Sequence, residues 1–283
     1  MQVATIRVGG GTTAVRAEGD RLVRINRPDV GALLADPDWR GVAEAADGES
    51  YAVDGADFAP LVPAPDKIVC VGLNYRSHIL EMGHPLPDTP TLFSKYRAAL
   101  IGAHDDIVVP PETTALDWEA ELAVVVGAPV RRVGVADAPA AIAGYAVLND
   151  VTARDWQNRT SQWLPGKTFE ATTPLGPFLV TTDDPVVAGR DGFAISCEVD
   201  GEVVQRATTS DLVFTPAELV SYVSTVITLL PGDVIATGTP AGVGHARTPP
   251  RYLSPGSRVV TRIEGVGECD NRCVSGGPAA AAV

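Results

Sequence analysis

Two glutamates stand two positions apart in the stretch DWEAELAVVVG, residues 117–127. The apolar run predicts a strand, and side chains along a strand alternate between its faces, so Glu119 and Glu121 should point the same way. Two carboxylates in a partly buried place repel each other. A hard cation such as Mg²⁺, Mn²⁺ or Ca²⁺ would relieve that repulsion by taking oxygen ligands. The pattern also fits an edge strand whose acidic face, with Asp117, is solvated.

A third oxygen ligand is available in the stretch AVLNDVTARDWQ, residues 146–157. Asp150 ends an apolar run at the point where the chain becomes polar, and strand ends facing a cleft are common places for ligands. The alternative is that Asn149 and Asp150 only cap a turn.

His78 and Glu81 are three residues apart in NYRSHILEMG. In a helical turn they would share a face, and a carboxylate beside an imidazole fixes the tautomer and raises the basicity that a general base needs. A surface His–Glu pair is the alternative. The histidines are residues 78, 84, 104 and 245, and no two have metal-ligand spacing, which argues against a histidine-rich zinc site.

Other loops exclude common chemistries. Lys167 lies in the polar loop LPGKTFEATTPLGP, and ATGTPAGVG is a glycine-rich loop without the lysine and hydroxyl residue of a nucleotide-binding P-loop. The chain has no G-x-S-x-G motif, so a serine-hydrolase elbow is also excluded. Its four cysteines lack zinc-site spacing and are expected to be free thiols in a reducing compartment.

The elements that would position these residues are mostly strands. Residues 1–62 predict a small α/β domain of short strands and one or two short helices, and three prolines between positions 60 and 65 mark a linker. Residues 65–275 read as a mixed β-rich α+β body, with a hairpin at Asp200-Gly201 and a helix capped by Thr215 and Glu218. Residues 276–283 predict a disordered tail.

The composition restricts the partners. Asp and Glu number 35 against 22 Lys and Arg, the net charge is -13, and no basic run occurs, which argues against nucleic acid. No apolar run approaches the ~20 residues that span a bilayer, and the first residues lack the features of a signal peptide. These features predict a cytoplasmic protein that does not bind membranes.

The order of the motifs resembles the fumarylacetoacetate hydrolase family across residues ~67 to 274. The matching stretches, in order, are GLNYRSHILEMG, LFSKY, DWEAELAVVVG, GYAVLNDVTARDWQ, GKTFEATTPLGP and PGDVIATGTPAGVG. The resemblance implies a mixed β-roll catalytic domain and a homodimer. The first 62 residues resemble the small additional domain of longer bacterial members.

The resemblance also implies roles for individual residues. Glu119, Glu121 and Asp150 would hold one divalent ion per subunit, Mg²⁺ or else Mn²⁺ or Ca²⁺. His78 and Glu81 would form a catalytic dyad on a lid, with Lys167 beside the ion. The substrate would be held by Arg154, Gln157, Thr239 and Lys95. Glu170 and Ala171 differ from the Asp and Thr of many members, and no proline follows Lys95 as it often does in the family.

The implied activity is hydrolysis of a 3-acylpyruvate, a 2,4-diketo acid, to pyruvate and a carboxylic acid. His78, oriented by Glu81, would activate a water, and the ion would stabilise the pyruvate enolate as a Lewis acid. Oxaloacetate decarboxylation and isomerisation of a 2-hydroxy-dienoate need the same stabilised enolate and stay open as alternatives.

Overall fold

The computed structural model of the chain describes residues 1–81, 83 and 85–277. Its main feature is a mixed 11-stranded sheet with the strand order β4-β3-β2-β1-β13-β11-β10-β16-β5-β6, to which β7 adds by pairing with β13. A second sheet has five strands in the order β15-β14-β17-β18-β8, and β9 and β12 form a separate pair. Pairing is mostly antiparallel, but β5 pairs with β16, β7 with β13 and β8 with β18 in parallel. The β-rich mixed α+β fold predicted from the sequence is confirmed.

The elements follow one another without the regular alternation of strand and helix that builds a doubly wound sheet. The strands are β1 (Gln2–Val8), β2 (Gly11–Glu18), β3 (Arg21–Arg24), β4 (Ser50–Ala52), β5 (Ile68–Gly72), β6 (Thr91–Lys95), β7 (Leu100–Ile101), β8 (Ile107–Val109), β9 (Leu116–Asp117), β10 (Ala120–Val126), β11 (Ile142–Asn149), β12 (Thr152–Ala153), β13 (Thr173–Thr181), β14 (Ala194–Val199), β15 (Glu202–Thr208), β16 (Val234–Ala236), β17 (Arg258–Ile263) and β18 (Gly267–Ser275). The α-helices are α1 (Val30–Leu34), α2 (Trp39–Glu44), α3 (Arg76–Glu81), α4 (Arg154–Gln157), α5 (Leu164–Lys167) and α6 (Pro216–Val226). Short 3-10 helices occupy Arg97–Ala99, Ala138–Ala141, Thr209–Asp211 and Gly244–Ala246.

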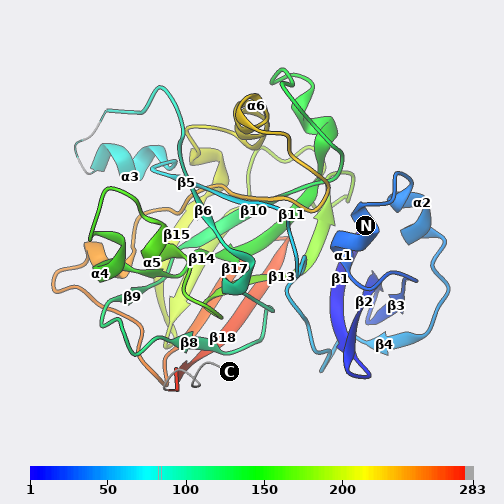
Figure 1. The fold of residues 1–283 in the computed structure, drawn as a ribbon, viewed down its shortest axis with the longest axis horizontal. Helices are drawn as coiled ribbons and strands as arrows, with labels where there is room; N and C mark the ends of the chain where they lie inside the picture. The colour runs from blue at the N-terminus through cyan, green and yellow to red at the C-terminus, as the bar shows by residue number, and fades with distance from the viewer. Residues whose placement is uncertain (82, 84, 278–283) are drawn as a thin grey trace, which may run out of the picture.

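The N-terminal strands continue the large sheet. Strand β1 pairs antiparallel with β13, with Gln2 opposite Val180 and Ala4 opposite Phe178, so β1–β4 extend the sheet of the body. Figure 1 shows these strands gathered at one side of the molecule, with α3, α4 and α5 at the opposite side. The functional side chains on α3, α4 and α5 therefore lie far from the N-terminal strands, and the domain boundary at residues 62–65 stays a prediction.

Buried apolar residues fill the space between the two sheets and the space under α6. One cluster joins Val147 of β11 to Ile195 and Cys197 of β14, and it includes Trp118. Another places Leu219 and Val223 of α6 against the large sheet. All four cysteines are buried free thiols, as predicted.

Local signals in the sequence explain two of these elements. The Thr215 side chain accepts a hydrogen bond from the backbone N–H of Glu218, and the Glu218 carboxylate accepts one from the backbone of Thr215, which completes the predicted capping box of α6. The helix ends at Val226, because Ile227 is extended. Asp200 and Gly201 have φ values of 54° and 83°, as the predicted tight hairpin requires.

The predicted tail at residues 276–283 falls mainly outside the described residues, which end at Gly277. Within them, the Gly276 N–H still donates to the carbonyl of Val109. Among the described residues, no helix reaches the length and apolar character that crossing a membrane requires.

Candidate active site

The segment that carries the two glutamates is an interior part of the fold. Strand β10 lies between β11 and β16 in the large sheet, and every one of its residues is buried. Glu119 sits just before β10, in a break that separates it from β9, and Asp117 in β9 pairs with Thr152. The interpretation of residues 117–127 as a solvated edge strand is therefore wrong, and Asp117, Glu119 and Glu121 are all buried.

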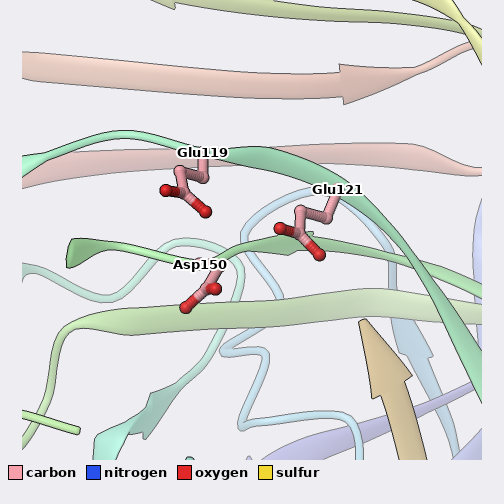
Figure 2. A group of neighbouring side chains, drawn as sticks. All are labelled: Glu119, Glu121 and Asp150. Atoms are coloured by element: carbon pink, nitrogen blue, oxygen red, sulfur yellow. The ribbon is translucent and has the colours of Figure 1, made fainter. Parts of the chain in front are cut away.

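The three predicted ligand residues converge. One carboxylate oxygen of each of Glu119, Glu121 and Asp150 lies within 4.8 Å of the other two, and all three residues are buried. Figure 2 shows the two glutamate side chains descending from one segment toward Asp150, which lies on the neighbouring one. The Asp150 N–H donates to the carbonyl of Glu119 (2.8 Å), and the Asn149 side chain accepts from the Glu119 N–H (2.9 Å). Asn149 and Asp150 therefore hold the backbone of Glu119 in place, and Asp150 also contributes a negative charge to the site.

Two lysines neutralise part of this group. Lys167 Nζ donates to Glu119 Oε2 (2.8 Å) and to Asp150 Oδ2 (2.7 Å). Lys95 Nζ donates to Asp150 Oδ1 (2.6 Å) and to the carbonyl of Val151 (3.1 Å). Both lysines are buried. Glu121 accepts a hydrogen bond from the Gly238 N–H (2.8 Å) but has no ion pair within the described part of the chain.

The ionisation of the three carboxyl groups follows from these contacts. Burial raises the pKa of Glu121 well above its ordinary value, and the nearby charges of Asp150 and Glu119 raise it further. Burial would also raise the pKa of Asp150, but the ammonium groups of Lys167 and Lys95 hold that pKa below its ordinary value. Burial alone would lower the pKa of Lys167, but Asp150 and Glu119 raise it, so Lys167 is a cation at neutral pH.

The donor set suits a hard divalent cation. Mg²⁺ and Ca²⁺ bind carboxylate oxygens at about 2.0–2.6 Å, so two oxygens on opposite sides of such an ion are roughly 4–5 Å apart, which matches the spacing of this group. Three cations, Lys95, Lys167 and Arg154, pair within this group. They face four carboxylates, those of the triad and of Asp117, so one negative charge is left over when all four are ionised. A divalent ion would give Glu121 the positive partner that its buried carboxylate lacks.

A cleft of about 360 Å³ opens above the carboxylates. Its lining residues are Val71, Gly72, Leu73, His78, Phe93, Glu119, Arg154, Gln157, Asn158, Trp163, Lys167, Thr239, Val243 and His245. The structure therefore brings His78, Arg154, Gln157, Lys167 and Thr239 to one cavity, and their catalytic and substrate-binding roles stay predictions. Lys95, Glu121 and Asp150 are buried and do not line it.

The structure describes only the histidine side chain of the predicted His78–Glu81 dyad. His78 lies in α3 and lines the cleft, and the spacing of His78 and Glu81 does fall within one short helix, as predicted. The side chain of Glu81 lies outside the described residues, so the pairing of the two side chains stays a prediction.

Helices α4 and α5 position the cationic side chains of Arg154 and Lys167. Arg154 opens α4 and Lys167 ends α5, and the two helices pack against each other so closely that a Cβ on Gly166 would lie 2.5 Å from the backbone nitrogen of Gln157. Glycine before Lys167 is therefore required by this contact. Lys167 Nζ also lies 4.8 Å from the centre of the Phe93 ring, which adds a cation–π contact.

Arg154 joins the carboxylate group to a fourth buried acid, Asp117. Its Nε donates to Asp117 Oδ2 (2.8 Å), and its Nη1 pairs with Glu119 Oε1 (2.7 Å) and donates to Gln157 Oε1 (3.0 Å). Burial opposes the charge, but Glu119 and Asp117 raise the pKa of Arg154, which is a permanent cation here. Arg154 and Gln157 thus hold each other, in addition to any contact with substrate.

Three residues of this site were not predicted. Asp117 also accepts from the N–H groups of Gly244 (2.7 Å) and His245 (3.0 Å). The buried Gln205 accepts from the Ala120 N–H and donates to Thr239 Oγ1, both within about 3 Å, and so ties the glycine-rich loop to β10. His245 lines the cleft. Asp117 was visible beside Glu119 in the sequence, whereas nothing near Gln205 or His245 marked them.

A β-rich fold that places a buried carboxylate triad beside a cleft lined by arginine, lysine and histidine has the features of an enzyme site that could hold a divalent cation. The sequence profile described as "Fumarylacetoacetate (FAA) hydrolase C-terminal" matches residues 67–274. The chain therefore belongs to the fumarylacetoacetate hydrolase family, whose members are enzymes and usually bind a divalent metal.

Several relatives have names that specify a reaction. A mitochondrial oxaloacetate tautomerase of Bos taurus is 47% identical over 219 residues, which are 77% of this chain and 69% of the relative. A human protein of the same name shows the same identity and coverage. Among solved structures, a 5-carboxymethyl-2-hydroxymuconate delta-isomerase from Mycobacterium smegmatis has a TM-score of 0.82 at 33% identity, covering 98% of this chain and 100% of that one. A fumarylacetoacetate hydrolase from Exiguobacterium antarcticum has a TM-score of 0.85 at 30% identity with the same coverage.

Proposed function

We propose that this protein interconverts the keto and enol forms of a 2-oxo acid of the oxaloacetate type, with a divalent ion at Glu119, Glu121 and Asp150. The observation that carries the proposal is the pair of permanent cations at the base of the cleft, with Lys167 on one oxygen of Glu119 and Arg154 on the other. Fixed positive charge is what a reaction that develops negative charge on an oxygen requires. The 47% identity to oxaloacetate tautomerases supports the choice of substrate.

The carboxylates of the triad would hold the ion, which supplies Lewis-acid stabilisation of negative charge on the 2-oxo oxygen when it is bound. Mg²⁺ is the first choice for an all-oxygen donor set, with Mn²⁺ and Ca²⁺ as alternatives. Lys95 is buried against Asp150 and does not line the cleft, so it acts on the charge of the site and does not contact the substrate.

The reaction needs one proton to leave C3 and one to reach the 2-oxo oxygen. His78 lines the cleft and is the imidazole placed to take the C3 proton, while the electron pair of the broken C–H bond moves toward the oxygen. Lys167 and Arg154 stabilise the resulting negative charge, and the oxygen then takes a proton from solvent or from the protonated His78, which completes the enol. The reverse direction uses the same groups in the opposite order.

Hydrolysis of a 3-acylpyruvate, the first expectation from the sequence, is the second candidate. It is supported by His78 in the cleft, which could activate a water molecule, and by the structural similarity to a fumarylacetoacetate hydrolase. Decarboxylation of oxaloacetate and isomerisation of a 2-hydroxy-dienoate would use the same stabilised enolate. These reactions differ in which bond breaks to form the enolate.

A single panel of substrates separates the candidates. Purified protein with Mg²⁺ is given enol-oxaloacetate, an acylpyruvate and a 2-hydroxy-dienoate, and loss of enol absorbance, CO₂ and pyruvate are followed in parallel. Tautomerisation predicts loss of the enol signal without CO₂ or pyruvate. Release of pyruvate and a second acid from the acylpyruvate, with no effect on enol-oxaloacetate, would replace the proposal with hydrolysis.

Variants then test the assignment of the residues. Glu119→Gln and Asp150→Asn should lose the ion and the activity while the fold survives. His78→Ala should keep the ion and lower turnover by about 100-fold or more, as expected for loss of a general base. Normal turnover in His78→Ala, or full activity of the wild type after treatment with a chelator, would contradict the proposed site.

A further inference from the structure

The cleft contains a second imidazole that the proposed reaction does not use. His245 lines the same cavity as Arg154, Glu119 and Lys167, and it comes from the loop that follows the glycine-rich segment, far in the sequence from His78. Its side chain is exposed to the cavity and solvent, so a ligand can reach it.

The position of His245 is fixed by its backbone. The carboxylate of Asp117 accepts from the N–H groups of Gly244 (2.7 Å) and His245 (3.0 Å), and the Arg251 N–H donates to the carbonyl of Gly244. A Cβ on Gly244 would lie 1.9 Å from the carbonyl oxygen of Arg251, so only glycine fits this turn. The same Asp117 carboxylate accepts from Arg154 Nε (2.8 Å). One buried carboxylate therefore binds both the Arg154 side chain and the backbone that carries His245.

Both residues keep a hydrogen-bond donor for a ligand. His245 Nδ1 lies 2.9 Å from the hydroxyl of Tyr252. A hydroxyl group can donate to a neutral imidazole or accept from a protonated one, so with this partner Nε2 can carry a proton in both states of the ring. Arg154 uses Nε and Nη1 in the contacts given above, and its Nη2 has no hydrogen bond within the described part of the chain.

We propose that His245 Nε2 and Arg154 Nη2 bind the distal carboxylate of a dicarboxylic 2-oxo acid, and that His245 makes the enzyme prefer such substrates over 2-oxo acids with an uncharged distal end. The inference rests on the proposed function, because it assumes that the first carboxylate and the 2-oxo group face the triad. Two N–H donors on residues that line one cleft and are anchored to the same buried acid suit the two oxygens of a carboxylate. Tyr252 acts as a positioning residue through the His245 ring.

A binding experiment tests the inference without relying on turnover. Malate and lactate both offer a carboxylate and an oxygen on C2, and malate alone has a distal carboxylate. Their dissociation constants are measured by calorimetry on the full chain loaded with Mg²⁺. The wild type should bind malate more tightly than lactate. His245→Ala should weaken malate binding by about tenfold, as expected for loss of one hydrogen bond to a charged group, and leave lactate binding within twofold.

Two further variants complete the design. Tyr252→Phe keeps the imidazole but removes its hydroxyl partner, and it should weaken malate binding by about threefold. His104→Ala removes an exposed imidazole that packs against Phe58 outside the cleft, and it should change neither ligand. Equal losses for malate and lactate in His245→Ala, no loss for either, or no preference for malate in the wild type would overturn the inference. Absence of tautomerase turnover alongside an intact malate preference would instead contradict only the proposed function.

Discussion

Asp117 and Glu121 are four residues apart and both are buried, yet their surroundings are opposite. The Asp117 carboxylate accepts four hydrogen bonds, from Arg154 Nε and from the backbone N–H groups of Trp118, Gly244 and His245. Within the described residues, the Glu121 carboxylate accepts one, from the Gly238 N–H. A buried carboxylate whose partners are all supplied by the protein has a structural role. A buried carboxylate without a positive partner requires a bound cation to balance its negative charge.

The cations follow the same division. Arg154 forms ion pairs with Asp117 and Glu119. Lys95 pairs with Asp150, and Lys167 pairs with both Asp150 and Glu119. Among the described residues of this site, each acidic side chain except that of Glu121 therefore has a cationic side chain as a neighbour. The protein therefore supplies a positive partner for all but one carboxylate of the site, and a bound ion would supply the partner of Glu121. Substitutions at Asp117 and at Glu121 should therefore separate effects on stability from effects on ion binding.

The largest effect is expected for Glu121→Gln. Replacing the carboxylate by an amide of the same shape removes the charge that only the ion balances. The affinity for Mg²⁺ or Mn²⁺ should fall by more than about 100-fold, because losing a group that merely orients a ligand already costs 10- to 100-fold. Activity should fall by about 10³-fold or more. Calorimetric titration with the metal and the enol assay measure the two effects.

Glu44→Gln is the matched control, since Glu44 is an exposed glutamate in α2 on the opposite side of the molecule from the cleft. It should leave ion affinity and activity unchanged. If Glu121→Gln keeps wild-type ion affinity, the contrast between the two carboxylates has no functional meaning.

The next largest effect is expected for Asp117→Asn, and it should fall on stability. The amide presents N–H groups to donors and removes one of the two buried counter-charges of Arg154, because only Glu119 remains. Breaking a buried ion pair on one side costs about 3–5 kcal/mol, so urea unfolding should show a loss of that size. The ion affinity should change far less than in Glu121→Gln.

The control for this substitution is Asp57→Asn, which removes an exposed carboxylate from its pair with Arg7 and should cost less than about 1 kcal/mol. An Asp117→Asn protein of wild-type stability would show that the four hydrogen bonds are not needed to hold the loop.

A smaller effect is expected for Lys95→Met. Lys95 is buried against Asp150, which keeps Lys167 as a second cation, so the ion-free protein should lose only about 1–3 kcal/mol. Because the carboxylate group becomes more negative, saturating Mg²⁺ should recover part of this loss. Thermal unfolding with and without Mg²⁺ compares Lys95→Met with the wild type, and a loss that is the same in both conditions would contradict this role.

The sequence predicted the parts of the site that depend on local pattern. Alternation indicated that Glu119 and Glu121 share a direction, and their carboxylates do converge, although Glu119 lies in the break before β10. The end of an apolar run placed Asp150 at a strand end, and it directly follows β11. The capping box of α6 and the Asp200-Gly201 hairpin depend on neighbouring residues and were predicted for the same reason.

Other parts depend on residues that are far apart in the sequence. Asp117 meets His245 across 128 positions and Gln205 meets Ala120 across 85, and no local pattern reports such pairs. The edge-strand interpretation was wrong because the number of neighbours of a strand is set by the topology, which here inserts β10 between β11 and β16. The homodimer and the pairing of His78 with Glu81 stay predictions.

Per pH unit, the smallest effect is a dependence of stability on pH that comes from Glu121. Its pKa in the folded, ion-free protein is raised well above the ordinary 4.5, first by burial and then by Asp150 and Glu119. Above pH 4.5 the unfolded chain has released this proton while the folded chain still holds it. The stability of the ion-free protein therefore falls as pH rises toward the folded pKa, by up to about 1.4 kcal/mol per pH unit. Asp150, whose folded pKa is lowered, changes stability only in more acidic solution.

Glu121→Gln has no ionisable group at this position, so the difference in stability between the wild type and the variant isolates the contribution of the Glu121 proton. Urea unfolding in a chelator at pH 5, 6, 7 and 8 should show the wild type losing stability relative to the variant as the pH rises. Parallel curves would mean that Glu121 is already ionised without an ion, and that the protein itself supplies the missing positive partner. With saturating Mg²⁺ the bound ion favours the ionised carboxylate, so the wild type should instead gain on the variant, because only its glutamate can use the charge that the ion brings.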